Sequence, residues 1–247
     1  MRQRPFLLAA LTGAALISPA AAQLAPHAGV EVATDERRRG LSWSDSQLAP
    51  AAWARIDLPS GIDLGARVTG TRGDARHGGA DAVIEPTLGY SRLAGGFRLD
   101  GFVTGHLFTG ARGSLDYGEL GAGASYTLGP IEAGAEARYA PSQSAIGGDN
   151  LYLGVRGRVG IPATPWTLAA SLGRSSGSVD DPIRAARLRP TGSYRDWSVG
   201  LEHITGPVTL ALVYTGTDIS DDAVVISPYA ALDHAGDRIA ARASIGF

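Results

Sequence analysis

The feature that most constrains this chain is a two-residue alternation of apolar and charged side chains, which recurs along most of its length. In residues 151–161, for example, Leu153 and Val155 lie on one face of an extended segment, and Arg156 and Arg158 lie on the other. Successive side chains of a β-strand point to opposite faces, so such a segment has one apolar and one charged face. Glycine, at 34 of 247 residues, interrupts every window in which a helical period could develop. The sequence therefore predicts an all-β fold.

Twelve strands are expected, and the connections between them alternate in length. Five connections are tight turns rich in Gly and Pro, and six are longer polar segments near residues 37–47, 71–81, 109–114, 141–149, 175–192 and 217–236. An even number of strands joined by alternating short turns and long loops is typical of a transmembrane up-and-down antiparallel β-barrel, with periplasmic turns and extracellular loops. The strands are expected near residues 28–36, 48–58, 61–70, 82–93, 96–108, 115–128, 130–140, 150–161, 165–174, 193–204, 207–216 and 237–247.

The N-terminal residues have the layout of an export signal. Arg2 and Arg4 precede an uncharged apolar stretch, residues 6–17, and Ala20–Ala22 fits a cleavage site. This stretch is shorter than the about 20 residues that a helix needs to cross a bilayer. We expect residues 1–22 to be a signal peptide and residues 23–247 to form one barrel domain in the outer membrane of a Gram-negative bacterium.

The charged faces of the strands are expected to line a water-filled pore. An arginine facing lipid at the bilayer midplane costs about 2–4 kcal/mol. Seven such residues would cost more than the stability of an ordinary domain, about 5–15 kcal/mol. The apolar faces are therefore expected to contact lipid, and closure of the sheet leaves no unpaired edge there. The expected pore-lining residues are Arg67, Arg98, Asp100, Glu119, Glu132, Glu136, Arg138, Arg156, Arg158, Glu202, Arg238 and Arg242.

Composition and motifs exclude several kinds of chemistry. There is no Cys for a disulfide, a thiol nucleophile or a thiolate metal site. A net charge of −2 gives no basic footprint for nucleic acid. No HExxH motif is present, although His106 and His203 lie on expected strands and could approach each other across a barrel. We therefore predict no catalytic residue, no metal and no cofactor, and a protein that is not an enzyme.

Charged residues of the long connections are expected to be solvated. Arg184, Arg187 and Arg189 are interpreted as a solvated loop helix, with contact to lipopolysaccharide phosphates as an alternative. Two acidic groups are interpreted in the same way, with binding of divalent cations as the alternative. They are Asp180 with Asp181, and Asp218 with Asp221 and Asp222.

The last residue, Phe247, ends an alternating strand in which Ile239, Ala243 and Ile245 share its face. Outer-membrane barrels commonly end in this way, at the strand that the barrel-assembly machinery recognises. We expect that machinery, outer-membrane lipid, lipopolysaccharide and small hydrophilic solutes to be the partners, and we expect no nucleic acid.

Several segments resemble the proteobacterial TorF family of porin-like proteins, formerly of unknown function. Residues 37–45 (RRRGLSWSD) resemble an early segment of that family, and residues 194–200 (YRDWSVG) resemble a late strand. Residues 213–218 and 237–247 fit as well, whereas Glu36 and Arg38 stand where that family's pattern predicts aromatic residues. The resemblance implies a barrel and a porin-like role, without naming a solute.

Two functions fit a membrane barrel of this size. The first is a channel for passive diffusion of small hydrophilic solutes or ions, since twelve strands lie between filled eight-stranded barrels and open porins. The alternative is a non-conducting barrel with a structural or surface-interaction role. A soluble periplasmic barrel is disfavoured, because Ala and Gly would fill its core poorly.

The seven expected lumen arginines outnumber five acids, whereas the loops are acidic, so the preferred ion stays open. One hypothesis is a basic wall of Arg98, Arg138, Arg156, Arg158, Arg238 and Arg242 facing Glu119, Glu132 and Glu136.

Overall fold

Twelve antiparallel strands close into a barrel in a computed structural model that describes residues 25–220, 226–230 and 235–247. Each barrel strand pairs with its neighbours in sequence, and the first strand closes the cylinder by pairing with the last. The predicted twelve-stranded all-β barrel is confirmed. Its strands are β1 (Ala25–Ala33), β4 (Ala49–Asp57), β5 (Ile62–Gly70), β6 (Ala82–Ala94), β7 (Phe97–Thr109), β8 (Tyr117–Leu128), β9 (Ile131–Gln143), β10 (Gly148–Gly160), β11 (Trp166–Ser176), β12 (Tyr194–Thr205), β13 (Val208–Thr217) and β14 (Arg238–Gly246).

The remaining elements are short and belong to the long connections. Two-residue strands β2 (Arg37–Arg38) and β3 (Leu41–Ser42) pair with each other between β1 and β4. Among the described residues, two 3-10 turns, η2 (Ala75–His77) and η3 (Ser144–Ile146), and one helical turn, α1 (Pro182–Ala185), are the other elements. Within the described ranges, no helix is long and apolar enough to cross a membrane.

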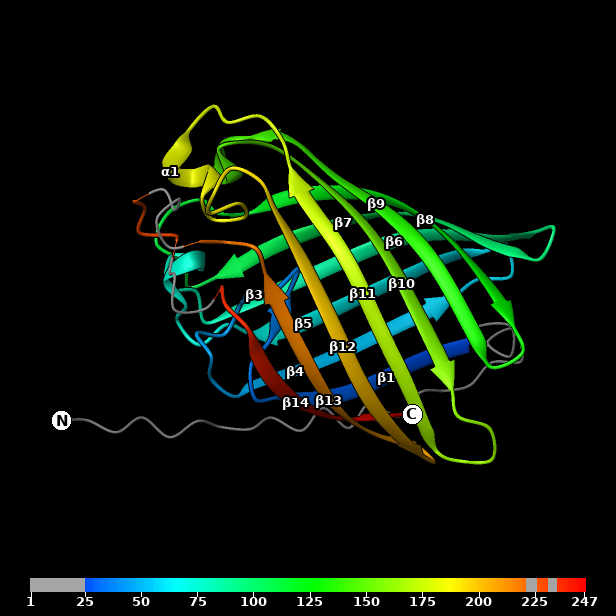
Figure 1. Ribbon diagram of the computed structural model, residues 1–247. Helices are drawn as coiled ribbons and strands as arrows, with labels where there is room; N and C mark the ends of the chain where they lie inside the picture. The colour runs from blue at the N-terminus through cyan, green and yellow to red at the C-terminus, as the bar shows by residue number, and fades with distance from the viewer. Residues whose placement is uncertain (1–24, 221–225, 231–234) are drawn as a thin grey trace, which may run out of the picture.

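The two ends of the barrel differ. Long connections and α1 gather at one end, called the loop end below (Figure 1). The short turns lie at the opposite end, called the turn end, where β1 begins and β14 ends. Because long and short connections alternate along the sequence, the long ones lie at one end of the barrel and the short ones lie at the other. The expected signal peptide, residues 1–22, lies outside the described residues.

The observed strand bounds differ from the expected ones mainly at one connection. Strands β9 and β10 continue toward the loop end, so the expected loop over residues 141–149 shrinks to residues 144–147. Gln143 and Gly148 pair across this shortened connection, and a register irregularity lies between Gly148 and Asn150. Pro141 and two consecutive glycines indicated a loop, but the tertiary pairing of two neighbouring strands overrides that local preference.

Apolar side chains cover the outside of the barrel. Near the middle of β10, Val155 is 53% exposed, and its partner Leu172 on β11 is 62% exposed. The same face carries exposed Leu, Val and Ile on nearly every barrel strand, including Leu64, Leu88, Val103, Leu120, Val199 and Leu212. Soluble monomers rarely expose a continuous apolar surface of this kind. Charged residues of the alternate positions lie inside, where the candidate site is found.

Candidate functional site

The interior of the barrel holds two adjoining cavities. A cavity of about 680 Å3 lies toward the loop end, and one of about 780 Å3 lies toward the turn end. Both are lined by inward-pointing residues of the strands, and six residues border both of them. A polar lumen therefore runs along most of the barrel. The six shared residues are Arg55, Asp63, Thr87, Thr104, Glu136 and Arg138.

A small hairpin from the first long connection lies inside the loop-end cavity. This lumen hairpin, residues 37–42, consists of β2, β3 and a two-residue turn. The turn residues Arg39 and Gly40 have φ values of 51° and 74°, as a type I′ turn requires. Asn or Gly is the usual first residue of such a turn, so Arg39 occupies a position that does not favour its backbone. The Arg39 side chain enters the lumen, where it contacts the barrel wall as described below.

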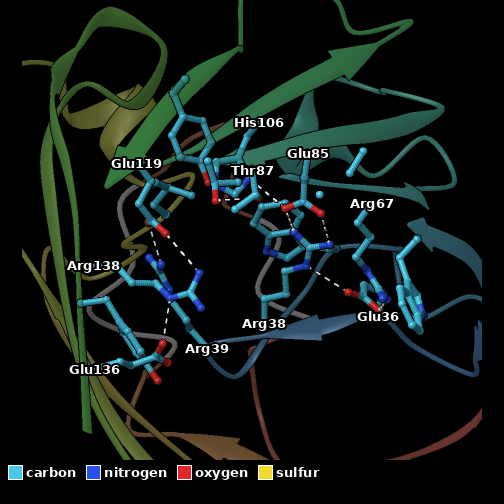
Figure 2. Close-up of a pocket in the computed structure, with 18 of the residues that line it drawn as sticks. Glu36, Arg38, Arg39, Arg67, Glu85, Thr87, His106, Glu119, Glu136 and Arg138 are labelled. Carbon is cyan, nitrogen blue, oxygen red and sulfur yellow. Dashed lines mark hydrogen bonds and ion pairs between the residues drawn. The ribbon is translucent and has the colours of Figure 1, made fainter. Parts of the chain in front are cut away.

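Arg38 ties the hairpin to one side of the barrel wall. Its guanidinium donates to both carboxylate oxygens of Glu85 on β6, with Nη2 2.7 Å from Oε2. Its Nε donates to Oε1 of Glu36 at 3.0 Å, and the guanidinium lies 4.2 Å from the ring centre of Trp43. Figure 2 shows Arg38 between Glu85 and Glu36. A bidentate guanidinium–carboxylate pair is among the stronger hydrogen-bonded contacts in proteins.

Arg39 reaches a different part of the wall. Its Nη2 lies 2.6 Å from Oε2 of Glu119 on β8. Glu119 also faces Arg138 of β9, whose Nη1 lies 3.6 Å from Oε1, and Arg138 Nε in turn lies 3.1 Å from Glu136. The backbone carbonyl of Arg39 accepts a hydrogen bond from the Tyr194 hydroxyl of β12 at 3.0 Å. The hairpin therefore spans the lumen, with contacts on β6, β8 and β12.

Nine of the twelve expected pore residues line the two cavities, whereas Arg158, Glu202 and Arg238 line neither. Arg67 and Arg242 share Glu31 of β1, at 2.6 and 3.5 Å. Arg98 contacts Asp100 at 2.9 Å. Arg138 pairs with Glu136 on the same strand, β9. Arg156 pairs with Glu132 of the neighbouring strand at 3.9 Å, and Arg158 of β10 pairs with Glu202 of β12. Arg238 lies at the loop end of β14, away from both cavities.

The hypothesis of a basic wall facing an acidic wall is wrong. Glu132 lies beside Arg156, and Glu119 and Glu136 lie beside Arg138, so the opposite charges alternate around the lumen. Adjacent strands bring Glu119 to Arg138 and Glu132 to Arg156, because register rather than overall charge count decides which residues meet. Glu136 and Arg138 meet because they are two residues apart on the same face of β9.

Sequence reasoning missed several lumen residues. Glu31, Arg55, Asp63 and Glu85 stand at inward positions of expected strands, so the same alternation that identified Arg67 indicates them. Residues of the lumen hairpin had no such signal, since a connection has no strand period to assign a face. The dense charge of residues 35–39 and the family resemblance of residues 37–45 distinguished that segment, but neither placed it in the lumen.

A packed core lies at the loop end of the barrel. Inner-face residues of β6 to β9 contribute Val83, Phe108, Tyr117 and Ala140, which are at most 8% exposed. The long connections add Trp43, Ala80, Leu115, Ala145, Ile146 and Leu188, all buried. This set of ten residues is called the plug below. A second small core, of Leu41, Tyr194 and Ala235, lies beside it.

Arg187 and His77 are buried beside the plug. Arg187 is fully buried, donates to the carbonyls of Leu115 and Ala145, and lies 4.3 Å from the ring centre of Phe108. Burial lowers the pKa of Arg187 to about 10. The His77 ring lies between Trp43 and Phe108, at centroid distances of 4.5 and 4.7 Å. Burial, with nearby Arg187 and Arg76, holds the pKa of His77 well below its ordinary value.

The expectation that all three loop arginines are solvated is wrong. Arg187 and Arg189 are not solvated, since they are 0% and 1% exposed, whereas Arg184 remains partly exposed beside α1. His106 lies in the lumen with Nδ1 3.0 Å from Glu85, while His203 packs against Trp166 at the turn end, so they do not approach each other.

The acidic loop groups are only partly described. Asp181 caps α1 through the backbone N–H groups of residues 183 and 184, Asp180 is exposed, and Asp221, Asp222 and His234 lie outside the described residues. No group of three or more His, Asp or Glu with metal-binding geometry occurs in the part of the chain that the structure describes.

Comparison with known proteins gives a family and a fold. A family model described as a bacterial protein of unknown function (Gcw_chp) matches residues 19–240. No curated protein matches the sequence significantly. Among solved structures, the KdgM porin is 8% identical with a TM-score of 0.57, over 90% of this chain and 98% of that one. The COG4313 outer membrane channel from Pseudomonas putida F1 is 14% identical with a TM-score of 0.52, over 90% and 95% of the two chains. At these identities the likeness concerns the fold.

Proposed function

This chain belongs to the Gcw_chp family of bacterial proteins, and we propose that it is an outer-membrane channel for passive diffusion of small hydrophilic solutes or ions. One observation carries the proposal: two adjoining cavities lined by charged side chains lie inside a barrel whose outer face is apolar. Water inside the barrel solvates the charged face, and hydrocarbon outside it solvates the apolar face. The shared fold with the KdgM porin and the TorF-like segments add support.

The orientation and partners follow from the same proposal. The loop end faces the cell exterior and the turn end faces the periplasm, as in barrels of this class. Residues 1–22 direct export, and Phe247 is the signal for the barrel-assembly machinery. Outer-membrane lipid and lipopolysaccharide surround the apolar face. We assign it no enzymatic activity, which stays a prediction.

The plug favours a second candidate, a barrel that does not conduct. Its ten residues are buried at the loop end, and the lumen hairpin crosses the cavity beneath them. In a channel, these segments are the gate, and permeation follows when they move. In a structural barrel they are a permanent closure. Long loops that fold inward are compatible with either outcome.

Planar-bilayer recordings separate the two candidates. Wild-type protein is expected to give discrete current steps, and Trp43→Ala is expected to raise the open probability, because Trp43 joins the hairpin to the plug through Arg38 and His77. Trp166→Ala is the matched control: Trp166 lies on the opposite end of the barrel, 39% exposed. Absence of steps in both wild type and Trp43→Ala, with heat-modifiable folded protein present, supports the non-conducting barrel instead.

A further inference from the structure

We propose that the lumen prefers uncharged polyhydroxyl solutes, such as sugars, over ions of either sign. This inference rests on the proposed channel function, since it names the solute class for the same lumen. It follows from how completely the lumen charges are paired and from the lining and size of the loop-end cavity.

Every arginine that lines the loop-end cavity has a carboxylate within 4 Å. Arg55 illustrates the rule, with Nη2 3.2 Å from Oδ2 of Asp63. The other pairs are Arg38 with Glu85, Arg39 with Glu119, Arg67 and Arg242 with Glu31, and Arg138 with Glu136.

The turn-end cavity is balanced in the same way. Four arginines and four carboxylates line it: Arg55, Arg98, Arg138 and Arg156, with Asp63, Asp100, Glu132 and Glu136. Neither cavity therefore presents a stretch of one sign.

Paired charges give an entering ion little compensation for the water it loses. A permeating cation or anion has to break an existing pair or pass beside a charge that is already neutralised, while its own desolvation is unfavourable. A hydroxyl group both donates and accepts hydrogen bonds, guanidinium groups donate, and carboxylates accept. A neutral polyol can therefore bond to both members of an ion pair without separating them.

The cavity also has an aromatic ring on its lining and a suitable size. Trp53, half-buried on the same lining, supplies an apolar ring with a polar N–H edge. A volume of about 680 Å3 lies within the about 300–1,000 Å3 typical of small-molecule sites.

Liposome swelling with three solutes of similar size tests the inference on the wild-type protein. Glucose is expected to enter several-fold faster than gluconate or glucosamine, and the reversal potential in a KCl gradient is expected to lie near zero. Entry of either charged analogue at the rate of glucose or faster overturns the solute preference while leaving the channel intact. No swelling with any solute, together with no bilayer current, contradicts the channel itself.

A charge variant provides an independent readout. Glu119→Gln removes the carboxylate shared by Arg39 and Arg138, so the reversal potential is expected to shift toward anion selectivity and gluconate entry is expected to rise. Asp180→Asn, which removes the same charge from an exposed loop residue outside both cavities, is expected to leave the reversal potential near zero. Equal reversal potentials for the two variants, both folded by gel mobility, contradict the proposal.

Discussion

At the residue scale, arginine joins segments that are distant in sequence. The chain has no Lys, so every such contact uses a planar guanidinium with five donors. Arg38 and Arg39 fix the lumen hairpin to β6 and β8. Arg189 does the same in the loop between β11 and β12, where it is 1% exposed and donates to four backbone carbonyls. These carbonyls belong to Asp149, Gly177, Ser178 and Gly192.

Arg189→Met is expected to loosen this loop without unfolding the barrel. The change leaves four carbonyls without their donor, and each hydrogen bond to a charged group contributes about 1.5–3 kcal/mol. Limited proteolysis of residues 177–193 is expected to accelerate at least tenfold, with heat-modifiable gel mobility retained. Arg184→Met, at a partly exposed arginine of the same loop, should have a smaller effect. Equal proteolysis of the two variants contradicts the role given to Arg189.

His77 should make the plug easier to open at acidic pH. Its pKa is depressed by burial in the folded state, so below about pH 6.5 the opened state binds a proton that the closed state does not. Closure therefore weakens as pH falls, by about 1.4 kcal/mol between pH 7.5 and 5.5 for one fully depressed group. The protection of residues 71–81 against hydrogen exchange is expected to fall as the pH is lowered. His77→Gln is expected to reduce this pH dependence. If the pH response is unchanged in His77→Gln, a group other than His77 causes it.

Residue roles were predictable only where a strand period exists. Alternation correctly separated inward Arg138 and Arg156 from outward Leu153 and Val155, because strand geometry fixes which way each side chain points. Burial of Arg187 was not predictable. A guanidinium in a loop is ordinarily solvated, and only the converging carbonyls of two other loops make its burial favourable.

At the scale of elements, the lumen hairpin positions the candidate site. Its type I′ turn aims Arg38 and Arg39 at different strands, and Gly40 presses against the β12–β13 side of the wall. A Cβ atom at Gly40 would overlap the Thr217 side chain and approach the Gly216 carbonyl at 3.0 Å. Glycine is required at position 40 because φ is positive and because a Cβ atom has no room there.

Gly40→Ala is therefore expected to displace the hairpin and to increase conductance. The strain of positive φ alone costs about 1 kcal/mol, and the overlap with Thr217 adds to it. Gly73→Ala is a matched control, because Gly73 has a φ of 78° and a Cβ atom added there would meet no other atom within 4 Å. Single-channel recordings should show larger or more frequent openings for Gly40→Ala alone. The same conductance in both variants would mean that the hairpin does not limit the current.

The sequence predicted strands more accurately than the structure of the connections. Each of the twelve barrel strands overlaps its expected range, since the period of two persists along the segment and Gly and Pro mark the turns. Strands β2 and β3 were not predicted. Two-residue strands have no detectable period, and the contacts that hold them lie on β6, β8 and β12.

At the scale of the whole molecule, closure of the sheet produces one apolar outer face and one ionic interior. Every barrel strand pairs on both edges, so no edge remains to be covered. The long connections then determine whether the interior communicates with the loop end. In the channel proposed above, conduction depends on the plug and the hairpin, and the ion pairs of the wall determine what the lumen admits.

Thiol modification during bilayer recording tests most directly whether the charged face encloses a conducting, water-filled lumen. The chain has no Cys, so Arg156→Cys and Val155→Cys each introduce one thiol at adjacent positions on opposite faces of β10. A charged, water-soluble thiosulfonate is expected to reduce the current steps of Arg156→Cys and to leave those of Val155→Cys unchanged. Reduction at Val155→Cys but not at Arg156→Cys would contradict the assignment of faces, and the absence of current in both would contradict the channel.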